Sequence, residues 1–306
     1  MADFKETVTS LFESVDSQVN GYRLCDPQIH NELFYSRVLS GGSLALGDGY
    51  MDGWWDCEAL DEFSCRLLRG RIDKQVKVTN PSFLMHVLKA YLFNAQNINR
   101  AYIVGEEHYD TGNDLFKLML DQRMNYSCGY WRNADNLEQS QVNKLDLACR
   151  KLHLKPGMRV LEIGCGWGAF AKYATENYGV SVHGITVSKE QMNYAKKSCE
   201  GLDVTFELKD YRALNTKYDA IVSIGMFEHV GYKNYRDYME VAHRCLGDKG
   251  LFLLHTIGRN TPSRSTDPWT NKYIFPNGMV PSPAQLSGAA QGIFVIEDWH
   301  NFGQDY

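Results

Sequence analysis

The sequence lacks the features of a membrane-spanning protein, of a secreted protein and of a metal-binding protein. A membrane-spanning helix needs about 20 consecutive apolar residues, and no run in the 306-residue chain approaches that length. The eight cysteines include no CxxC pair, which argues against a disulfide framework and a zinc site. The N-terminus also lacks the apolar core of a signal peptide. These absences predict a soluble, cytoplasmic protein without a metal centre.

An excess of positive charge is missing as well. The formal net charge is −5, whereas proteins that bind nucleic acid by phosphate contacts usually carry a surplus of lysine and arginine. We therefore expect no nucleic-acid partner. What the chain does have is a 44% share of hydrophobic residues, enough for one large core or two unequal ones.

The composition changes along the chain and predicts two domains. Residues 1–80 are expected to form a small helical domain, and its glycine-rich centre SGGSLALGDGYMDGWW (40–55) predicts tight turns around aromatic side chains. Residues 81–104 are expected to form an apolar helix and a linker. Such a helix must be buried or must meet lipid. Residues 105–306 are expected to form the second, larger domain.

Strand-like and helix-like segments alternate from about residue 155. The expected strands are 158–164, 180–187, 202–208, 218–225, 251–257 and 292–300. The alternation predicts a parallel, doubly wound α/β sheet, in which ligands bind at the carboxyl ends of the strands. Glu228 and His229 follow the fourth of these strands and His255 ends the fifth, so we expect them at the mouth of a site.

A glycine loop, Gly164-Cys165-Gly166-Trp167-Gly168, follows the first of these strands. Its GxGxG spacing differs from the GxGxxG of dinucleotide-binding folds. The second strand also ends in Thr186, where an NAD site would place an acidic residue. An NAD dehydrogenase is therefore disfavoured. S-adenosylmethionine carries no pyrophosphate and suits such a loop, so the pattern predicts a Rossmann-like, class I S-adenosylmethionine-dependent methyltransferase.

The roles of three further positions stay open on the residues alone. Gln191 either caps the helix that Ser188 begins or faces the ribose of the cofactor. Asp210 and Tyr211 follow the third strand, where this fold would meet the adenine. The alternative for this pair is a turn-forming aspartate and an exposed tyrosine.

Seven segments in register resemble the cyclopropane fatty acid synthases. They are HYDTGNDLFKLMLDQRMNYSCGYW (108–131), VLEIGCGWGAFAKY, GITVSKEQ, SIGMFEHVGYKNY, LFLLHTIG, DPWTNKYIFPNG and EDWHNFGQDY. The match runs from about residue 40 to the last residue. It includes GDGYMDGWWD, which is similar to the bacterial, phospholipid-modifying branch of the family.

The resemblance implies transfer of a methylene group from S-adenosylmethionine to the cis double bond of an acyl chain in membrane phospholipid. The reaction would pass through a carbocation that a bound bicarbonate ion deprotonates. The residues that match the bicarbonate site are Cys128, Glu228, His255, Ile257 and Tyr306. The residues that match the cofactor site are Tyr126, Ser127, Gly164, Cys165, Gly166, Gly168, Thr186, Val187, Gln191, Asp210 and Tyr211.

Without this resemblance, the same residues would have plainer interpretations. Cys128 would be a buried free thiol, His255 a hydrogen-bonded strand end and Glu228 a loop carboxylate or helix cap. With it, His255 and Tyr306 would donate hydrogen bonds to the anion, and Glu228 would accept its O–H. Cys128 and Ile257 would act largely through their backbone groups. His229 is expected to hold the loop.

The substrate implies a membrane partner. Exposing a ~16-carbon acyl chain to water would cost on the order of 13 kcal/mol, so the enzyme is expected to dock peripherally on the inner face of the membrane. The helix around 83–93 and the pair Trp54-Trp55 are the candidates for docking. The alternative is that they form the core of the small domain. That small domain also makes a homodimer the expected assembly.

Family members continue for some tens of residues past the matching DY, so the chain is expected to be incomplete at its C-terminus. Two other functions stay open. One is a methyltransferase that adds a different group to a lipid alkene, and the other is a non-catalytic lipid-binding fragment.

Overall fold

The computed structural model describes residues 4–72 and 113–305, which belong to two compact units. The first unit comprises residues 4–72 together with the segment 267–274. The second comprises residues 113–266 and 275–305. The expected helix and linker at 81–104 lie outside the described residues.

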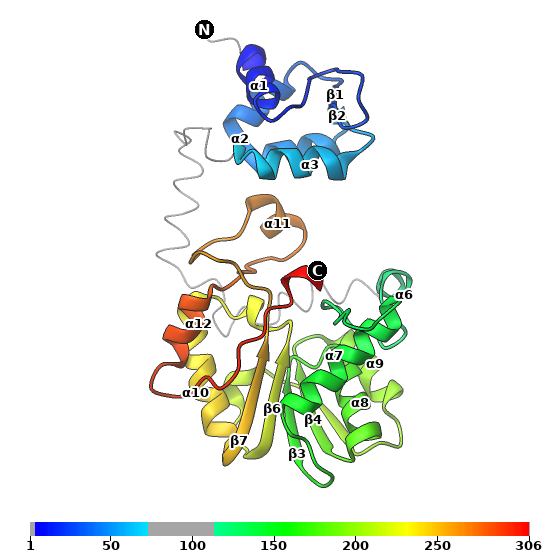
Figure 1. Cartoon of the computed structure of the whole chain (residues 1–306), viewed down its shortest axis with the longest axis vertical. Helices are drawn as coiled ribbons and strands as arrows, with labels where there is room; N and C mark the ends of the chain where they lie inside the picture. The colour runs from blue at the N-terminus through cyan, green and yellow to red at the C-terminus, as the bar shows by residue number, and fades with distance from the viewer. Residues whose placement is uncertain (1–3, 73–112, 306) are drawn as a thin grey trace. The chain divides into compact units, whose positions relative to one another are not determined.

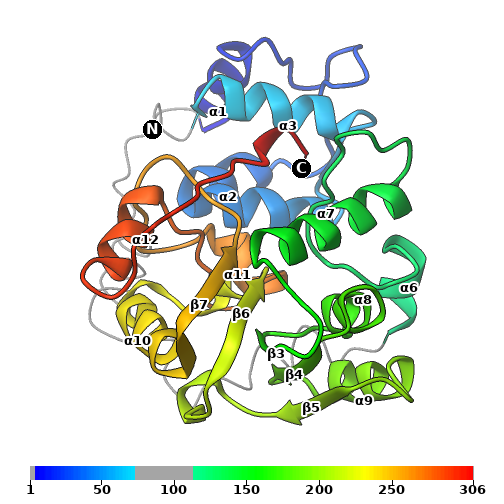
Figure 2. The same cartoon turned by 60° about the horizontal axis from the view of Figure 1, so that its bottom comes forward.

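A five-stranded parallel sheet forms the centre of the second unit, in the order β5-β4-β3-β6-β7 (Figure 2). The strands are β3 (Arg159–Ile163), β4 (Ser181–Thr186), β5 (Val204–Leu208), β6 (Tyr218–Ile224) and β7 (Leu246–His255). The chain winds outward from β3 in one direction and then returns to add β6 and β7 on the other side. This arrangement confirms the predicted doubly wound sheet, and it creates a switch point between β3 and β6 where such sheets bind ligands.

Helices cover both faces of this sheet (Figure 1). Those on one face are α7 (Leu137–Lys151), α8 (Ala169–Tyr178) and α9 (Lys189–Ser198), and those on the other are α10 (Tyr235–Cys245) and α12 (Pro283–Ala290). Side chains alternate between the faces of a strand. Accordingly, Val160 of β3 lies in the core on the α7 face, whereas its neighbour Leu161 lies in the core on the α10 face. Shorter elements are α6 (Asp114–Met119), η3 (Tyr211–Ala213), η4 (Phe227–His229), η5 (Tyr232–Asn234) and η6 (Gly303–Asp305).

The prediction of a sixth strand at 292–300 is wrong. These residues adopt no strand, and Val295 in their centre is 85% exposed. The segment instead packs side chains against the sheet and α7: the ring of Phe294 lies 5.6 Å from that of Phe252 in β7, and Asp298 pairs with Lys151. β-branched and aromatic residues favour a strand only where another strand supplies the hydrogen bonds.

The first unit is built from α1 (Phe4–Glu13), α2 (Phe34–Met51), α3 (Leu60–Arg69) and a short antiparallel pair, β1 (Gln28–Ile29) with β2 (Trp55–Asp56). The prediction of tight turns at 40–55 is wrong for its first part, because residues 40–51 belong to α2. Only Gly42 leaves the helical conformation there, with φ 58° and ψ −137°, and it produces a kink. The other glycines of α2 keep helical angles and let neighbouring side chains approach closely.

Trp55 is part of the core of this unit. It is 3% exposed, its ring packs edge-on against Phe63, and its indole N–H donates to the carbonyl oxygen of Leu46 at 2.9 Å. The alternative interpretation, that the pair Trp54-Trp55 forms the core of the small domain, is therefore correct for Trp55, and the partly buried Trp54 packs against the same core. The other docking candidate, around 83–93, lies outside the described residues.

A helix from the far end of the sequence, α11 (Pro268–Tyr273), also belongs to the first unit. Asp267 begins it, accepting from the backbone N–H of Thr270 and from the hydroxyl of Ser43. Lys272 pairs with Asp48 at 3.2 Å. A Cβ on Gly47 would lie 2.3 Å from the ring of Trp269, so only glycine allows this packing. Nothing in the sequence pattern indicated this placement.

Within residues 4–72 and 113–305, no helix combines the length and the apolar character needed to cross a bilayer.

Candidate active site

The glycine loop turns the chain sharply at the end of β3. Gly164 and Gly166 have φ of 81° and 51°, values that L side chains rarely adopt. The backbone N–H groups of Gly164 and Cys165 both donate to the carbonyl oxygen of Ile185, at 3.0 and 2.9 Å. A Cβ on Gly164 would also come within 2.6 Å of the Met226 side chain. The loop therefore lies against the end of β4, and Gly164, Cys165 and Gly166 line a pocket there.

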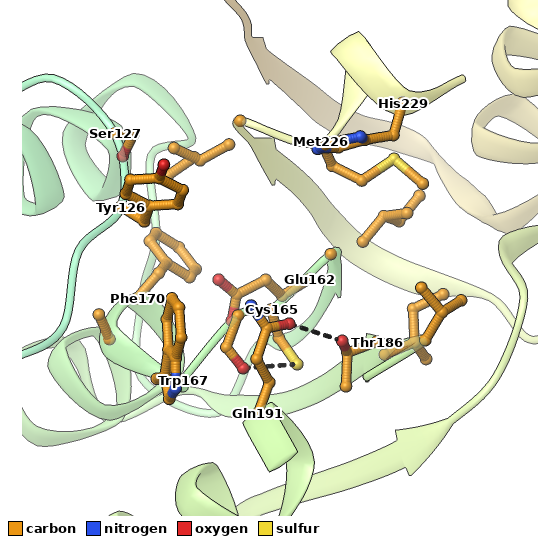
Figure 3. A pocket seen from close by; sticks show the side chains of 18 of the residues that line it. Tyr126, Ser127, Glu162, Cys165, Trp167, Phe170, Thr186, Gln191, Met226 and His229 are labelled. Atoms are coloured by element: carbon orange, nitrogen blue, oxygen red, sulfur yellow. Dashed lines mark hydrogen bonds between the residues drawn. The ribbon is translucent and has the colours of Figure 1, made fainter. Parts of the chain in front are cut away.

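A pocket lies at this carboxyl edge of the sheet (Figure 3). Its lining includes all but one of the residues predicted to bind the cofactor, namely Tyr126, Ser127, Gly164, Cys165, Gly166, Thr186, Val187, Gln191, Asp210 and Tyr211. Gly168 is the exception. It precedes α8 with φ 86°, and a Cβ there would lie 3.0 Å from the ring of Phe206. Its role in the structure is to let α8 start close to β5.

Gln191 lies in the pocket and does not use its side-chain oxygen for capping. Its Oε1 accepts a hydrogen bond from the hydroxyl of Thr186 at 2.9 Å, drawn as a dashed line in Figure 3. Ser188 caps α9 by accepting from the backbone N–H of Gln191 at 3.2 Å. Because Thr186 occupies the amide oxygen, the amide nitrogen of Gln191 is the group left to donate to a ligand.

Asp210 forms a turn, as one interpretation predicted, and both Asp210 and Tyr211 also line the pocket, as the other predicted. The Asp210 carboxylate begins η3 by accepting from the backbone N–H of Arg212 at 2.9 Å, and it pairs with the Arg212 guanidinium at 2.8 Å. Tyr211 is buried, and burial raises its pKa. It is therefore not the exposed tyrosine of the alternative interpretation, and both residues line the pocket.

The sequence interpretation missed several lining residues, of which Glu162 is the most informative. Further members of the lining are Trp167, Lys209, Met226, His229 and Asn277. Glu162 is buried at the end of β3 and accepts a hydrogen bond from the backbone of Ala171. Burial holds the pKa of its carboxyl well above the usual range, and its Oε2 has no partner among the described residues. An acidic residue two positions before the glycine loop was the available signal.

His229 was expected only to hold a loop, but its side chain faces the pocket. Figure 3 shows it beside Met226, across the cavity from Tyr126. Its ring packs edge-on against Phe275 at 5.7 Å. It is therefore within the lining that a ligand would meet.

Three of the residues predicted for the bicarbonate site, Glu228, His255 and Ile257, lie at or just after the ends of the neighbouring strands β6 and β7. Cys128 lies in the segment between α6 and α7, and two pairs among these four residues are in contact. The Cys128 sulfur lies 3.5 Å from Nε2 of His255. The backbone N–H of Ile257 donates to Oε1 of Glu228 at 2.7 Å. In this structure the backbone N–H of Ile257 therefore holds Glu228, and its predicted contact with bicarbonate stays a prediction. Tyr306 lies outside the described residues.

Burial shifts Glu228 and His255 toward their neutral forms. It raises the pKa of Glu228, against the hydrogen bond from Ile257, and the Oε2 of Glu228 has no partner in the described chain. It lowers the pKa of His255 to about 4, and the Lys144 ammonium adds to that shift. His255 is therefore a neutral imidazole near pH 7, able to donate from one ring nitrogen and accept at the other.

The described residues contain no group of three or more histidine, cysteine, aspartate or glutamate side chains that could hold a metal ion. The site offers a pocket at the glycine loop, the buried carboxyl of Glu228 with one unsatisfied oxygen, and the imidazole of His255.

Comparisons with known sequences agree with this geometry. Residues 96–306 match the family described as "Mycolic acid cyclopropane synthetase". The chain is 54% identical over 291 residues to the cyclopropane-fatty-acyl-phospholipid synthase of Escherichia coli K12, an alignment covering 94% of this chain and 75% of that protein. It is 43% identical over 161 residues to cyclopropane mycolic acid synthase 3 of Mycobacterium tuberculosis, covering 51% of this chain and 56% of the relative.

Solved structures give the same result. The cyclopropane synthase MmaA2 of Mycobacterium tuberculosis superimposes with a TM-score of 0.57 at 35% identity, covering 62% of this chain and 73% of that one. The mycolic acid cyclopropane synthase CmaA1, solved with SAH and CTAB, gives a TM-score of 0.58 at 36% identity and the same coverage. These findings confirm the predicted fold and the resemblance. The chain belongs to the cyclopropane synthetase family of S-adenosylmethionine-dependent methyltransferases.

Proposed function

We propose that this protein transfers a methylene group from S-adenosylmethionine to the cis double bond of an unsaturated acyl chain in membrane phospholipid, forming a cyclopropane ring. The observation that carries the proposal is the buried carboxylate of Glu228, which keeps one oxygen unsatisfied at the same sheet edge as a neutral His255. The name and 54% identity of the Escherichia coli relative support the substrate class.

The reaction needs no base to begin. The π electrons of the alkene attack the sulfonium methyl, so a C–C bond forms, the C–S bond breaks and S-adenosylhomocysteine leaves. A carbocation then remains on the acyl chain. Loss of a proton from the transferred methyl group supplies the electron pair that closes the ring. The site must therefore tolerate a developing positive charge and must provide a route for one proton.

Glu228 and His255 fit these two tasks. A bicarbonate ion, when bound, would supply the base. The neutral imidazole of His255 would donate a hydrogen bond to this anion, and Oε2 of Glu228 would accept one from its O–H. The N–H of Ile257 fixes the other Glu228 oxygen at 2.7 Å, so the carboxylate is held in one orientation. An oriented, buried carboxylate also stabilises a nearby cation more strongly than one in water.

The proposal includes docking of the enzyme on the inner face of the membrane. Its support is energetic. Exposing a ~16-carbon acyl chain to water costs on the order of 13 kcal/mol, so the chain must pass directly from the bilayer into the protein. The buried Trp55 does not supply the docking surface. The homodimer stays a prediction, which a mass measurement in solution would check.

The test is mass spectrometry of lipids after the protein is incubated with S-adenosylmethionine and vesicles of cis-unsaturated phospholipid. We expect an acyl chain heavier by one CH2 that shows cyclopropane protons by NMR. A heavier chain without ring protons would instead indicate a methyltransferase that adds another group to the alkene. Calorimetry with S-adenosylhomocysteine separates the remaining alternative, since a protein that binds lipid but not this ligand is non-catalytic.

A further inference from the structure

Helix α7 carries a lysine in the interior of the second unit. Lys144 is 3% exposed, and its ammonium donates to the hydroxyl oxygen of Ser127 at 2.7 Å and to Oδ1 of Asn125 at 3.1 Å. Burial lowers its pKa to about 8, although Cys128, Asp121 and Glu162 pull in the opposite direction. The group is therefore still mostly protonated near pH 7. A buried cation is expensive to maintain and calls for an explanation.

The ammonium is not needed to hold the loop that it contacts. Asn125 is already fixed by Asp121, which accepts from its backbone N–H at 2.6 Å and from its side-chain amide at 2.9 Å. Gln141, one turn before Lys144 on α7, holds the backbone of the same loop by donating to the carbonyl oxygen of Ser127 at 2.8 Å. An apolar side chain of similar size at position 144 would leave these hydrogen bonds in place.

The contact does determine how Ser127 can meet a ligand. A hydroxyl has one hydrogen to donate. Because the Ser127 oxygen accepts from Lys144, its own hydrogen is left for an acceptor, and Ser127 lines the pocket (Figure 3). An acceptor at this hydroxyl would also lie one side chain away from a desolvated positive charge. An anionic acceptor at the Ser127 hydroxyl would be stabilised more than a neutral one, because the positive charge of Lys144 is close and poorly screened.

The pocket also contains a hydrogen-bond acceptor, at Glu162. Glu162 lines the same cavity, and its Oε2 accepts from no described residue. A donor toward an anion and a free acceptor toward a cation together match the amino-acid end of S-adenosylmethionine, which carries a carboxylate and an ammonium.

We infer that Lys144 is a positioning residue which, through Ser127, makes this pocket select a nucleoside ligand that bears a carboxylate. The inference rests on the proposed function, since it takes S-adenosylmethionine as the cofactor. It adds a requirement that the proposed function does not contain, because neither the pocket lining nor the reaction needs a buried cation on α7.

A matched pair of ligands tests this inference in the full chain. S-adenosylhomocysteine and its decarboxylated form differ only in the carboxylate, and calorimetry gives the ratio of their dissociation constants. We expect Lys144→Met to reduce the preference for S-adenosylhomocysteine by about tenfold or more, which is the loss of one charge-assisted contact. Gln141→Met is the control, because it removes a neutral hydrogen bond to the same residue. It should leave the ratio within about twofold of wild type.

Each outcome has one meaning. A ratio unchanged in Lys144→Met, or equal losses for both ligands, overturns the inference and leaves only a structural role. If Lys144→Met does not fold, Ser127→Ala must lower the ratio instead, and an unchanged ratio there overturns the inference equally. A wild-type protein that binds neither ligand overturns the proposed function itself, which is a different result from an unchanged ratio.

Discussion

The two halves of the site each contain a buried glutamate, but the surroundings of the two carboxylates differ. Glu162, at the end of β3, lies in the field of the Lys144 ammonium, which lowers its pKa against the effect of burial. Burial raises the pKa of Glu228, in η4, and hydrogen bonds, the first of them from the backbone N–H of Ile257, act against that shift. Each keeps one oxygen without a described partner.

The difference corresponds to two functions, cofactor binding near Glu162 and assistance to the reaction near Glu228. A cofactor arrives with its charges fixed, so a pocket that binds it gains from a permanent cation and a permanent acceptor. A group that assists a reaction must instead act on charge that appears only in the transition state. A lysine beside Glu228 would satisfy that carboxylate in advance and weaken its attraction for a carbocation.

The largest effect is expected for Glu228→Gln. Removing the carboxylate charge should lower turnover of phospholipid by about 10²-fold or more, the scale of a positioned acid–base group. Binding of S-adenosylhomocysteine should stay within about twofold, because Glu228 is outside the pocket lining. If lipid mass spectrometry showed turnover within a few-fold of wild type, Glu228 would have no role in the reaction that Glu162 lacks.

The second effect concerns stability at the reactive half. The pKa of His255 falls from an unfolded value of 6.5 to about 4 in the folded protein. The unfolded chain therefore binds the extra proton first as the pH drops. Stability contributed by this group is lost between pH ~6.5 and ~4, by about 3 kcal/mol at most. Urea unfolding of wild type and His255→Asn across this range should show the difference, and parallel curves would contradict it.

A smaller effect is expected on the cofactor side. Glu162→Gln keeps the shape of the side chain but turns an acceptor oxygen into an amide donor facing the ligand ammonium, and should weaken binding of S-adenosylhomocysteine by about tenfold, the loss of one charge-assisted contact. Turnover at saturating cofactor should change by only a few-fold. If turnover fell as far as in Glu228→Gln while affinity was unchanged, the roles of the two glutamates would be reversed.

The smallest effect tests the floor of the pocket. Thr186→Val removes the hydroxyl that holds the amide oxygen of Gln191 at 2.9 Å. A single neutral hydrogen bond contributes about 1 kcal/mol, so calorimetry should show cofactor affinity reduced by about fivefold. Gln191→Ala, combined with Thr186→Val, should add less than its separate effect, because the two side chains act as one unit.

The sequence was sufficient for the sheet and for the cofactor pocket, because both follow from local patterns. Alternating segments predicted β3 to β7, and the glycine spacing after β3 located the pocket. The segment 292–300 was misassigned, because its composition suits a strand but a strand exists only where another strand pairs with it. The centre of α2 was misassigned because glycines that serve close packing look like glycines that serve turns.

Lys144 shows the other limit. A lysine among polar residues such as Asn143 and Asp146 in α7 is expected on the solvent side of a helix. Only the three-dimensional contacts with Asn125 and Ser127 reveal that it is inside. The pairing of Cys128 with His255 is similar, since the two residues are 127 positions apart. The motifs that resemble the family identified both residues, but no local pattern placed them together.

Helix α11 has a consequence for how this protein can be divided. Its residues are encoded within the stretch that otherwise forms the second unit, yet Asp267, Trp269 and Lys272 contact α2. No single cut in the gene separates the two units. Recombination that exchanged the N-terminal part for that of a relative would bring a foreign α2 to a resident α11. Such a hybrid would be compatible only if position 47 were a glycine and positions 43 and 48 still bound Asp267 and Lys272.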